Sequence, residues 1–399
     1  MRIGPLRRPE RFMVLRMHLA RYVRNVRSRW WWRLPILAAA LTVLAGVPAI
    51  AVVAPAALPA PSFDGPVYSV AYRGDVVFVG GQFAAAVVAG RRMPRQHLAA
   101  FDARTGRLLD WAPPADGTVQ ALAVAGGTVY AATDSGLTGL DAGTGAASGF
   151  KHRVAGRVTA LAAGADRLYA GGRFSAVDGV KRGNLAAFTL AGGALDPAWT
   201  AGVDDAVNGL GVDGSRVYLG GRFHRVNGSS ALRLAAVDAS TGALDRGFRP
   251  NPPAEVLGVA TEARPGERGG AAVVAAMGGQ GGRAAGYSAA GAMRWQRVFD
   301  GDVQTVAVLD GVTYLGGHFD AACTTTRNGA HGICTDGAAA RVKLAAVDRS
   351  GRLLDWAPQA NGIVGVRSLA AGAATGTVTA GGEFTTIGGI VQKRVAIFG

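Results

Sequence analysis

Short apolar runs recur along the chain from residue 67 to the C-terminus and divide it into similar segments. Each segment opens with an apolar run, passes a turn that contains glycine or aspartate, and enters a second run that ends in Gly-Gly-x-Phe. A third run, such as residues 98–102, follows. Apolar runs bounded by turn residues predict β-strands, and their recurrence at roughly 50-residue intervals predicts a repeat architecture.

Seven copies align on the first valine of each segment. These are Val67, Val119, Val158, Val207, Val256, Val303 and Val364. A repeat of this length corresponds to one four-stranded propeller blade. The sequence therefore predicts an all-β fold, a seven-bladed β-propeller that occupies residues 57–399.

Gly-Gly-x-Phe ends the second strand in five copies, beginning at Gly80, Gly171, Gly220, Gly316 and Gly381. The second copy has Ala132-Thr133 instead, the fifth has a displaced Gly278-Gly279, and the seventh is stretched when it is counted from Val364. Paired glycines at a strand end indicate a bulge or a close backbone approach. A phosphate-binding loop would open a helix, and no helical period follows.

An aromatic residue lies eight positions before the next leading valine at all six internal junctions: Trp111, Phe150, Trp199, Phe248, Trp295 and Trp356. We expect these rings in a fourth strand, where they would pack between neighbouring blades. A row of rings that stack on sugars is the alternative.

Several third strands end in an Asp-x-(Ser/Thr)-x-Gly-like turn, as at residues 102–106 and 238–242. In such turns the Asp side chain accepts backbone N–H bonds and glycine takes the left-handed position. A calcium site would need more oxygen ligands than this pattern offers.

The last copy stops at Gly399, after its third strand, so another segment must supply its fourth. We expect residues 57–64 to complete the seventh blade and close the ring, which removes exposed strand edges. Pro59 stands where the other copies have an aromatic residue.

The N-terminal region predicts export of the repeats. Residues 1–33 hold ten arginines and one acidic residue, Glu10, and the apolar segment 34–56 follows. About 21 apolar residues span roughly 31 Å as a helix, enough for a bilayer core. Both an uncleaved signal anchor, which we favour, and a cleaved signal peptide would place residues 1–33 in the cytoplasm and export the array.

The net charge of +15 does not indicate nucleic-acid binding, because nine of the fifteen charges lie in residues 1–33. The repeat array is only mildly basic. Basic residues nevertheless gather in the segments between the second and third strands, which we expect on one face of a propeller. They could form an arc that binds an anionic envelope polymer or a protein partner: Arg91, Arg92, Arg95, Lys181, Arg182, Arg225, Arg327, Arg341, Lys343, Lys393 and Arg394. An ordinary solvated rim is the alternative.

The two cysteines, Cys323 and Cys334, bracket an insertion in the sixth copy. In an exported protein they are expected to form a disulfide. A zinc site with His318 and His331 is the alternative, but the spacing matches no standard zinc finger.

The run from Tyr218 through Gly220-Gly-Arg-Phe223 to Leu234-Ala-Ala-Val-Asp238 resembles the bacterial delta-sixty propeller repeat, a domain of unknown function in exported proteins. The resemblance covers most of the chain and implies a propeller and export, with no catalytic residues. The segment 102–111 is more weakly similar to blades of pyrroloquinoline quinone proteins.

The sequence shows no nucleophile elbow, closely spaced histidine pair or acidic cluster. We therefore expect a monomeric binding or scaffold module of the cell envelope that needs no metal or cofactor. It would be tethered to the membrane by its N-terminal helix or released after cleavage. The alternative is an exported hydrolase or quinone-dependent enzyme with its site at the channel mouth, because acids from different blades could still converge there.

Overall fold

The computed structural model describes residues 51–262 and 272–399, which form an all-β structure of small antiparallel sheets. One 3-10 turn, η1 (Ala330–Gly332), is the sole helical element in these ranges. The predicted segment 1–33 and nearly all of the predicted segment 34–56 lie outside the described residues. Within the ranges described, no helix has the length and apolar character needed to cross a membrane.

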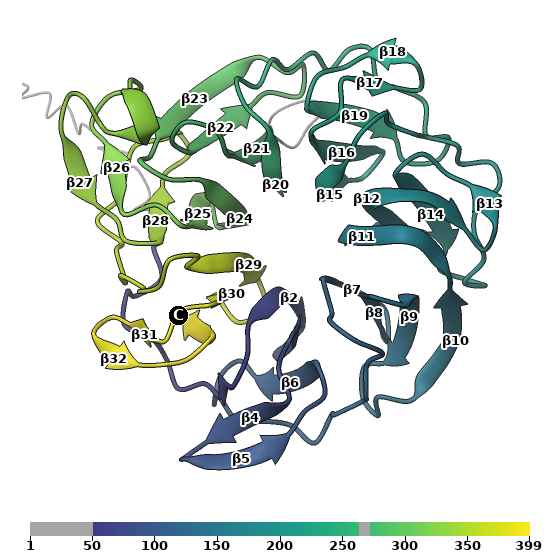
Figure 1. Ribbon diagram of the computed structural model, residues 1–399, viewed down its shortest axis with the longest axis horizontal. Coiled ribbons are helices and arrows are strands. Elements are labelled where there is room, and N and C mark those ends of the chain that lie inside the picture. Colours follow the sequence, from purple (N-terminus) through teal and green to yellow (C-terminus); the bar gives the residue numbers. More distant parts are fainter. Residues whose placement is uncertain (1–50, 263–271) are drawn as a thin grey trace, which may run out of the picture. The chain divides into compact units, whose positions relative to one another are not determined.

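Each of the seven copies opens with a leading strand. These are β2 (Val67–Arg73), β7 (Ala121–Ala125), β11 (Val154–Ala163), β15 (Val207–Asp213), β20 (Val256–Glu262), β24 (Val303–Leu309) and β29 (Val366–Gly372). Each leading strand contacts that of the next copy, and β29 contacts β2 (Figure 1). The contacts between leading strands therefore form a closed cycle.

Each leading strand pairs with a second strand, and the second pairs with a third. The second strands are β3 (Val76–Gly81), β8 (Thr128–Thr133), β12 (Arg167–Val177), β16 (Arg216–Gly221), β21 (Ala272–Met277), β25 (Val312–Gly317) and β30 (Thr377–Gly382). The third strands are β6 (Leu98–Asp102), β9 (Gly136–Asp141), β14 (Leu185–Thr189), β19 (Leu234–Asp238), β22 (Arg283–Tyr287), β28 (Leu344–Val347) and β33 (Val395–Phe398).

The seventh copy begins at Val366 rather than at Val364. Val366 pairs with Gly382, as Val67 pairs with Gly81 in the first copy. The extra length lies in the turn, because Gly372 pairs with Thr377 whereas Arg73 pairs with Val76. The alignment on Val364 was wrong because it kept the eight-residue spacing from Trp356, whereas Val364 and Gly365 precede β29.

The paired glycines hold neighbouring copies together. A Cβ added to Gly80 would lie 2.4 Å from Val119 Cγ1 of the next copy. A Cβ on Gly381 of the seventh copy would lie 2.7 Å from Val67 Cγ1 of the first. The first glycine of each pair therefore makes room for the leading valine of the next copy, and the structural interpretation of Gly-Gly-x-Phe is confirmed.

The six aromatic residues at the junctions are all buried. Trp111 shares a hydrophobic cluster with Phe78 of its own copy and with Val119 of the next. A turn of the following copy covers the ring, as Gly351 covers Trp295 at a site where a Cβ would lie 2.7 Å from the indole. The predicted packing is confirmed, and buried rings cannot form a row that stacks on sugars.

The predicted fourth strand is regular in only two of the described sheets, as β10 (Ala147–His152) and β23 (Met293–Val298). Elsewhere it is reduced to a single bridge, such as Phe188 with Leu195 or Val237 with Leu244. The expectation of seven regular fourth strands was wrong, because the aromatic packing holds this edge in place without a continuous ladder.

The segment expected to close the seventh copy divides between two partners. Leu58 bridges Ile397 of β33, and its N–H donates to the Ile397 carbonyl at 2.8 Å. Ala54 likewise donates to the Gly399 carbonyl at 3.0 Å. Further along, β1 (Ser62–Phe63) pairs with β4 (Ala85–Val88) of the first copy instead. This segment thus joins the last copy to the first.

The segments between second and third strands form short two-stranded ribbons in five copies. They are β4 with β5 (Arg91–Pro94), the end of β12 with β13 (Val180–Lys181), β17 (Arg225–Val226) with β18 (Ser229–Ser230), β26 (Ala321–Cys323) with β27 (Ala338–Ala340), and β31 (Thr386–Ile387) with β32 (Ile390–Val391). In Figure 1 several of them lie well away from the leading strands.

Candidate functional site

The leading strands enclose a small polar cavity of about 190 Å³. Because side chains alternate along an extended chain, the leading valine of each copy is buried between sheets and the next residue faces the cavity. One such residue comes from each copy: Tyr68, Gln120, Thr159, Asn208, Leu257, Gln304 and Arg367. Six of the seven are polar, and the described lining contains no carboxylate.

Many polar groups of this cavity are already bonded between neighbouring strands. Ser69 Oγ accepts the Leu122 N–H at 2.9 Å, and Thr305 Oγ1 accepts the Leu369 N–H at 2.9 Å. Thr159 Oγ1 donates to the Val207 carbonyl at 2.7 Å. Ligand sites commonly enclose roughly 300–1,000 Å³. The cavity is therefore better suited to joining the strands than to holding a ligand.

A wider depression of about 470 Å³ opens onto the cavity and shares Tyr68, Gln120 and Arg367 with it. Its charged residues are partly paired, with Arg157 Nη2 4.0 Å from Asp134 Oδ1. Arg367 lies 3.2 Å from Glu383 and stacks 5.7 Å from the Tyr68 ring centre. Gln82 and Thr118 complete the lining. We call this depression the mouth.

Tyr68 can act as a hydrogen-bond donor in the mouth. Burial, and after it the negative charge of Glu383, raise the pKa of Tyr68 above its ordinary value. The hydroxyl therefore stays protonated at neutral pH. It lies 3.4 Å from Gln82 Oε1 and faces the same depression.

A second depression, of about 410 Å³, lies in the third copy and is basic. Its polar lining comprises Arg173, Lys181, Arg182, Ser175 and Asn184, with no carboxylate among the described lining residues. Arg173 is the variable residue of Gly171-Gly-Arg-Phe174, and Lys181 lies in the adjoining ribbon. We call it the basic depression.

The mouth and the basic depression meet at two facing arginines. Arg157 of β11 is directly opposite Arg173 of β12 in the antiparallel register. Directly opposed like charges on neighbouring strands are destabilising. Arg173 is exposed, and its side chain makes no hydrogen bond or ion pair within the part of the chain that is described. An anion bound between the two sites would offset this repulsion.

Two other polar residues of the basic depression are structural. Arg182 donates from Nη1 to the Lys181 carbonyl and from Nη2 to the Asp196 carbonyl, both at 3.1 Å. Asn184 accepts the Phe174 N–H at 2.9 Å and donates to the Val203 carbonyl at 3.0 Å. Arg173 and Lys181 are therefore the cations that a ligand would meet.

Nearly half of the basic residues predicted to form the binding arc are instead used inside the protein. Arg95 and Lys343 are buried, and Lys343 Nζ lies 2.6 Å from Asp320 Oδ1. Like Arg182, Arg341 and Arg394 donate to main-chain carbonyls. These side chains therefore have hydrogen-bond partners within the protein, mostly carbonyls at the bases of the ribbons.

The remaining predicted residues differ in how they are paired. Arg92 lies 2.6 Å from Asp64, and Arg327 lies 3.0 Å from Asp336. Arg225 donates to the Gly228 carbonyl at 3.0 Å. In the described residues, three are exposed with no side-chain partner: Arg91, Lys181 and Lys393.

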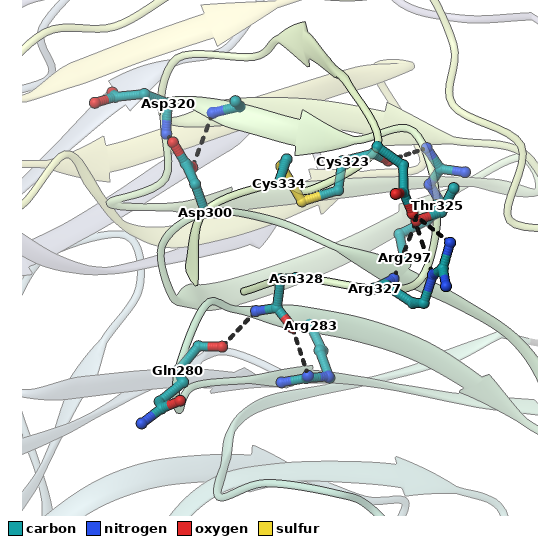
Figure 2. The surroundings of a disulfide bond; sticks show 12 residues. Gln280, Arg283, Arg297, Asp300, Asp320, Cys323, Thr325, Arg327, Asn328 and Cys334 are labelled. Carbon is teal, nitrogen blue, oxygen red and sulfur yellow. Dashed lines mark hydrogen bonds and ion pairs between the residues drawn. A yellow bond between two sulfur atoms is a disulfide. The ribbon is translucent and has the colours of Figure 1, made fainter. Parts of the chain in front are cut away.

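In the sixth copy, Cys323 and Cys334 are joined by a disulfide (Figure 2). Neither sulfur is then a thiolate that could bind zinc, and no group of three metal-ligating residues occurs in the ranges described. The stapled segment reaches the fifth copy, where Asn328 donates to the Gln280 carbonyl at 2.5 Å and accepts from Arg283 at 3.1 Å. The fifth copy is one of two that have no ribbon of their own in the described ranges.

Sequence reasoning missed Arg157, Arg173 and Arg367. Arg173 occupies the variable position of a motif that we interpreted as structural, and Arg367 follows a leading valine that the alignment misplaced. A signal was available for Arg367 alone, because each leading valine is followed directly by one variable, mostly polar residue, whereas Arg157 precedes its valine and Arg173 lies on a second strand.

No family model matches this chain, and neither does any curated protein. Among solved structures, the chain is similar to the computationally designed Ika8 protein, with 16% identity and a TM-score of 0.50. The match covers 84% of this chain and 98% of the designed one. At this identity the likeness concerns the fold alone.

Proposed function

We propose that the seven sheets are the blades of a β-propeller and that the protein is an extracytoplasmic binding or scaffold module. The closed cycle of contacts between leading strands supports the propeller. A basic segment before an apolar one supports export, and the disulfide suits an oxidising compartment. Membership in the delta-sixty family is part of this proposal and rests on the repeat motif.

The ligand that we propose is an anionic polymer of the cell envelope. The observation that carries this is the Arg157–Arg173 pair, which places two like charges opposite each other beside Lys181. A polymer could lie across the mouth and the basic depression, because Arg157 lines the first and Arg173, opposite it, lines the second. A chain of anionic groups would meet successive cations along this path.

Binding is favoured over hydrolysis by the cavity lining. Glycoside hydrolysis needs two carboxyl groups on either side of the scissile bond. The described lining of the central cavity provides none, and the one carboxylate lining the mouth, Asp134, lies beside Arg157. No specific observation favours the exported enzyme.

The test is retention of the full-length protein on a column of a sulfated glycan and on one of immobilised polyphosphate. We expect the double variant Arg173→Ala, Lys181→Ala to elute at lower salt and to bind about three- to tenfold more weakly. A matched control, Arg91→Ala with Lys393→Ala, removes the same charge from two other ribbons.

Equal retention of wild type and the Arg173/Lys181 variant on both columns would exclude the proposed surface. Equal weakening by both double variants would instead support the wider basic arc. Preference for one column would identify the anionic group.

A further inference from the structure

One arginine has the same internal role in three copies. Arg95, Arg182 and Arg341 each lie three residues before the third strand. In each, Nη1 donates to the carbonyl of the preceding residue, at 2.7 Å, 3.1 Å and 2.7 Å respectively. In each copy one residue after the third strand forms a single β-bridge back to that strand. Nη2 donates to the carbonyl of the residue that follows this bridge residue: Leu109, Asp196 and Leu354 respectively. The guanidinium thus links the base of a ribbon to the degenerate fourth strand.

The seventh copy has an amide at the equivalent sequence position, bonded to other carbonyls. Gln392 lies three residues before β33, and its Nε2 donates to the Val395 carbonyl at 2.8 Å and to the Pro61 carbonyl at 3.3 Å. Four copies therefore place a long side chain with N–H donors at this position. The site is built to receive hydrogen-bond donors.

The fourth copy has Ala231 at this position, three residues before Leu234. The methyl group cannot reach the carbonyls that would receive the guanidinium, which are those of Ser230 and Asp245. A cavity of about 420 Å³ is found there, and Ser230, Ala231, Asp245 and Phe248 are in its lining. We call it the alanine pocket.

The acceptors of the alanine pocket are its main-chain carbonyls. The Asp245 carboxylate is already paired with Arg216 at 2.9 Å. The Asp245 carbonyl accepts the Phe248 N–H at 3.3 Å, and a carbonyl oxygen has a second lone pair. Phe248 is also a lining residue, but its ring is buried and packs edge-on 5.2 Å from the Tyr218 ring, so the carbonyls are the groups that a guanidinium would meet.

The outer lining sets a further condition on the ligand. Arg246 and Arg249 line the alanine pocket and are exposed. A lone cation would be repelled by them, whereas a ligand that also carries a carboxylate would pair with them. The pocket therefore suits a guanidinium group with a carboxylate close by.

We propose that the alanine pocket binds an arginine, with its guanidinium in the place of the missing internal side chain and a neighbouring carboxylate at Arg246 and Arg249. The arginine could be the free amino acid or a residue of a partner protein next to an acidic residue. Both present the same chemistry. This site is independent of the proposed polymer surface.

The experiment titrates the full-length protein with L-arginine and with a capped Arg-Asp dipeptide, using calorimetry or ligand-observed NMR. Agmatine, which lacks the carboxylate, and L-citrulline, which lacks the positive charge, are the matched comparisons. We expect both to bind at least about tenfold more weakly than L-arginine, because charged hydrogen bonds contribute about 1.5–3 kcal/mol each.

Variants of Ala231 connect binding to the pocket. Ala231→Arg should fill it from within, as Arg182 does in the third copy, and abolish binding. Ala231→Gln, which introduces the amide found in the seventh copy, serves if the arginine variant does not fold. Ala231→Ser leaves the pocket open and should bind as wild type does.

Binding of L-arginine and the dipeptide would support a general arginine site, and binding of the dipeptide alone would indicate a partner protein. Binding by neither would overturn the proposal. Undiminished binding in both Ala231→Arg and Ala231→Gln would also overturn it.

Discussion

The third and fourth copies share one strand frame and differ in a few side chains placed on it. Val158 pairs with Gly172 in one, and Val207 pairs with Gly221 in the other. Arg182 of the third copy fills the place that Ala231 leaves open in the fourth. The comparison teaches that apolar and glycine positions maintain the frame, while the variable positions decide what each copy can bind.

The largest loss of stability should come from replacing the aromatic residue at the end of either copy, Trp199 or Phe248. Trp199 is fully buried, packs 5.5 Å from Tyr169 and donates to the Asp238 carbonyl at 3.3 Å. We expect Trp199→Ala to lower the free energy of unfolding by about 3–5 kcal/mol in urea titration. Phe248→Ala should cost less, because the ring is smaller and makes no hydrogen bond. A greater loss for Phe248→Ala would contradict this ranking, and Trp199→Phe is the conservative control.

The next effect concerns the internal arginine. Arg182→Ala should lower the free energy of unfolding by about 1–3 kcal/mol, since two carbonyls lose a charged donor. Millimolar methylguanidinium should restore part of the lost thermal midpoint, whereas tetramethylammonium, which has no N–H donor, should not. Ala231→Arg is the reciprocal change and should raise the midpoint. If methylguanidinium does not rescue Arg182→Ala and Ala231→Arg does not raise the midpoint, the internal arginine contributes nothing to stability.

A pH effect should distinguish the two turns. Side-chain hydrogen bonds from Ser240 and Thr241 lower the pKa of Asp238 to about 2, while the third copy has Thr189 at this position. A lowered pKa in the folded state favours the ionised form, so this stabilisation is present above about pH 4 and is lost as the pH falls towards 2. Its size is at most about 2 kcal/mol, reduced by partial exposure.

The test is Asp238→Thr, which makes the fourth turn like the third. Urea midpoints of wild type and variant should differ at pH 6 and converge as the pH falls from 4 towards 2. A constant difference across this range would remove Asp238 from the pH dependence.

The smallest predicted difference in stability is between alanine variants of Arg173 and Arg222, the two surface arginines that follow Gly-Gly. Arg222 lies 3.9 Å from Glu255, so Arg222→Ala should cost up to about 0.5 kcal/mol. Arg173 is opposite Arg157 and has no such partner in the described chain, so Arg173→Ala should be neutral or stabilise by a few tenths of a kcal/mol. If Arg173→Ala is less stable than wild type at low salt, Arg157 and Arg173 do not destabilise the folded protein by charge repulsion.

Much of the fold was predictable because its signals are local and repeated. The strand runs recur in every copy and the glycine pair in five, and an aromatic precedes five of the six junctions by eight residues and the last, at Val366, by ten. The fourth strand was not predictable in this way. Aromatic burial fixes its position, and whether a ladder also forms depends on contacts with the next copy.

The candidate site was much harder to predict from the sequence. The excess of basic residues in the ribbons was visible in the sequence, but not that Arg95, Lys343 and others would turn inward. That choice depends on which carbonyls lie within reach, and one acceptor of Arg95 and of Lys343 belongs to another segment, 14 and 25 residues away.

The sequence by itself determined the all-β repeats, the role of Gly-Gly-x-Phe and the buried aromatics, because the same residue types recur in copy after copy and each type has one common structural use. Only the tertiary structure decided that Arg157 lies opposite Arg173 and that Ala231 leaves a pocket. These features depend on strand register and on carbonyls brought together from separate segments, where charge and hydrogen bonding act across space rather than along the chain.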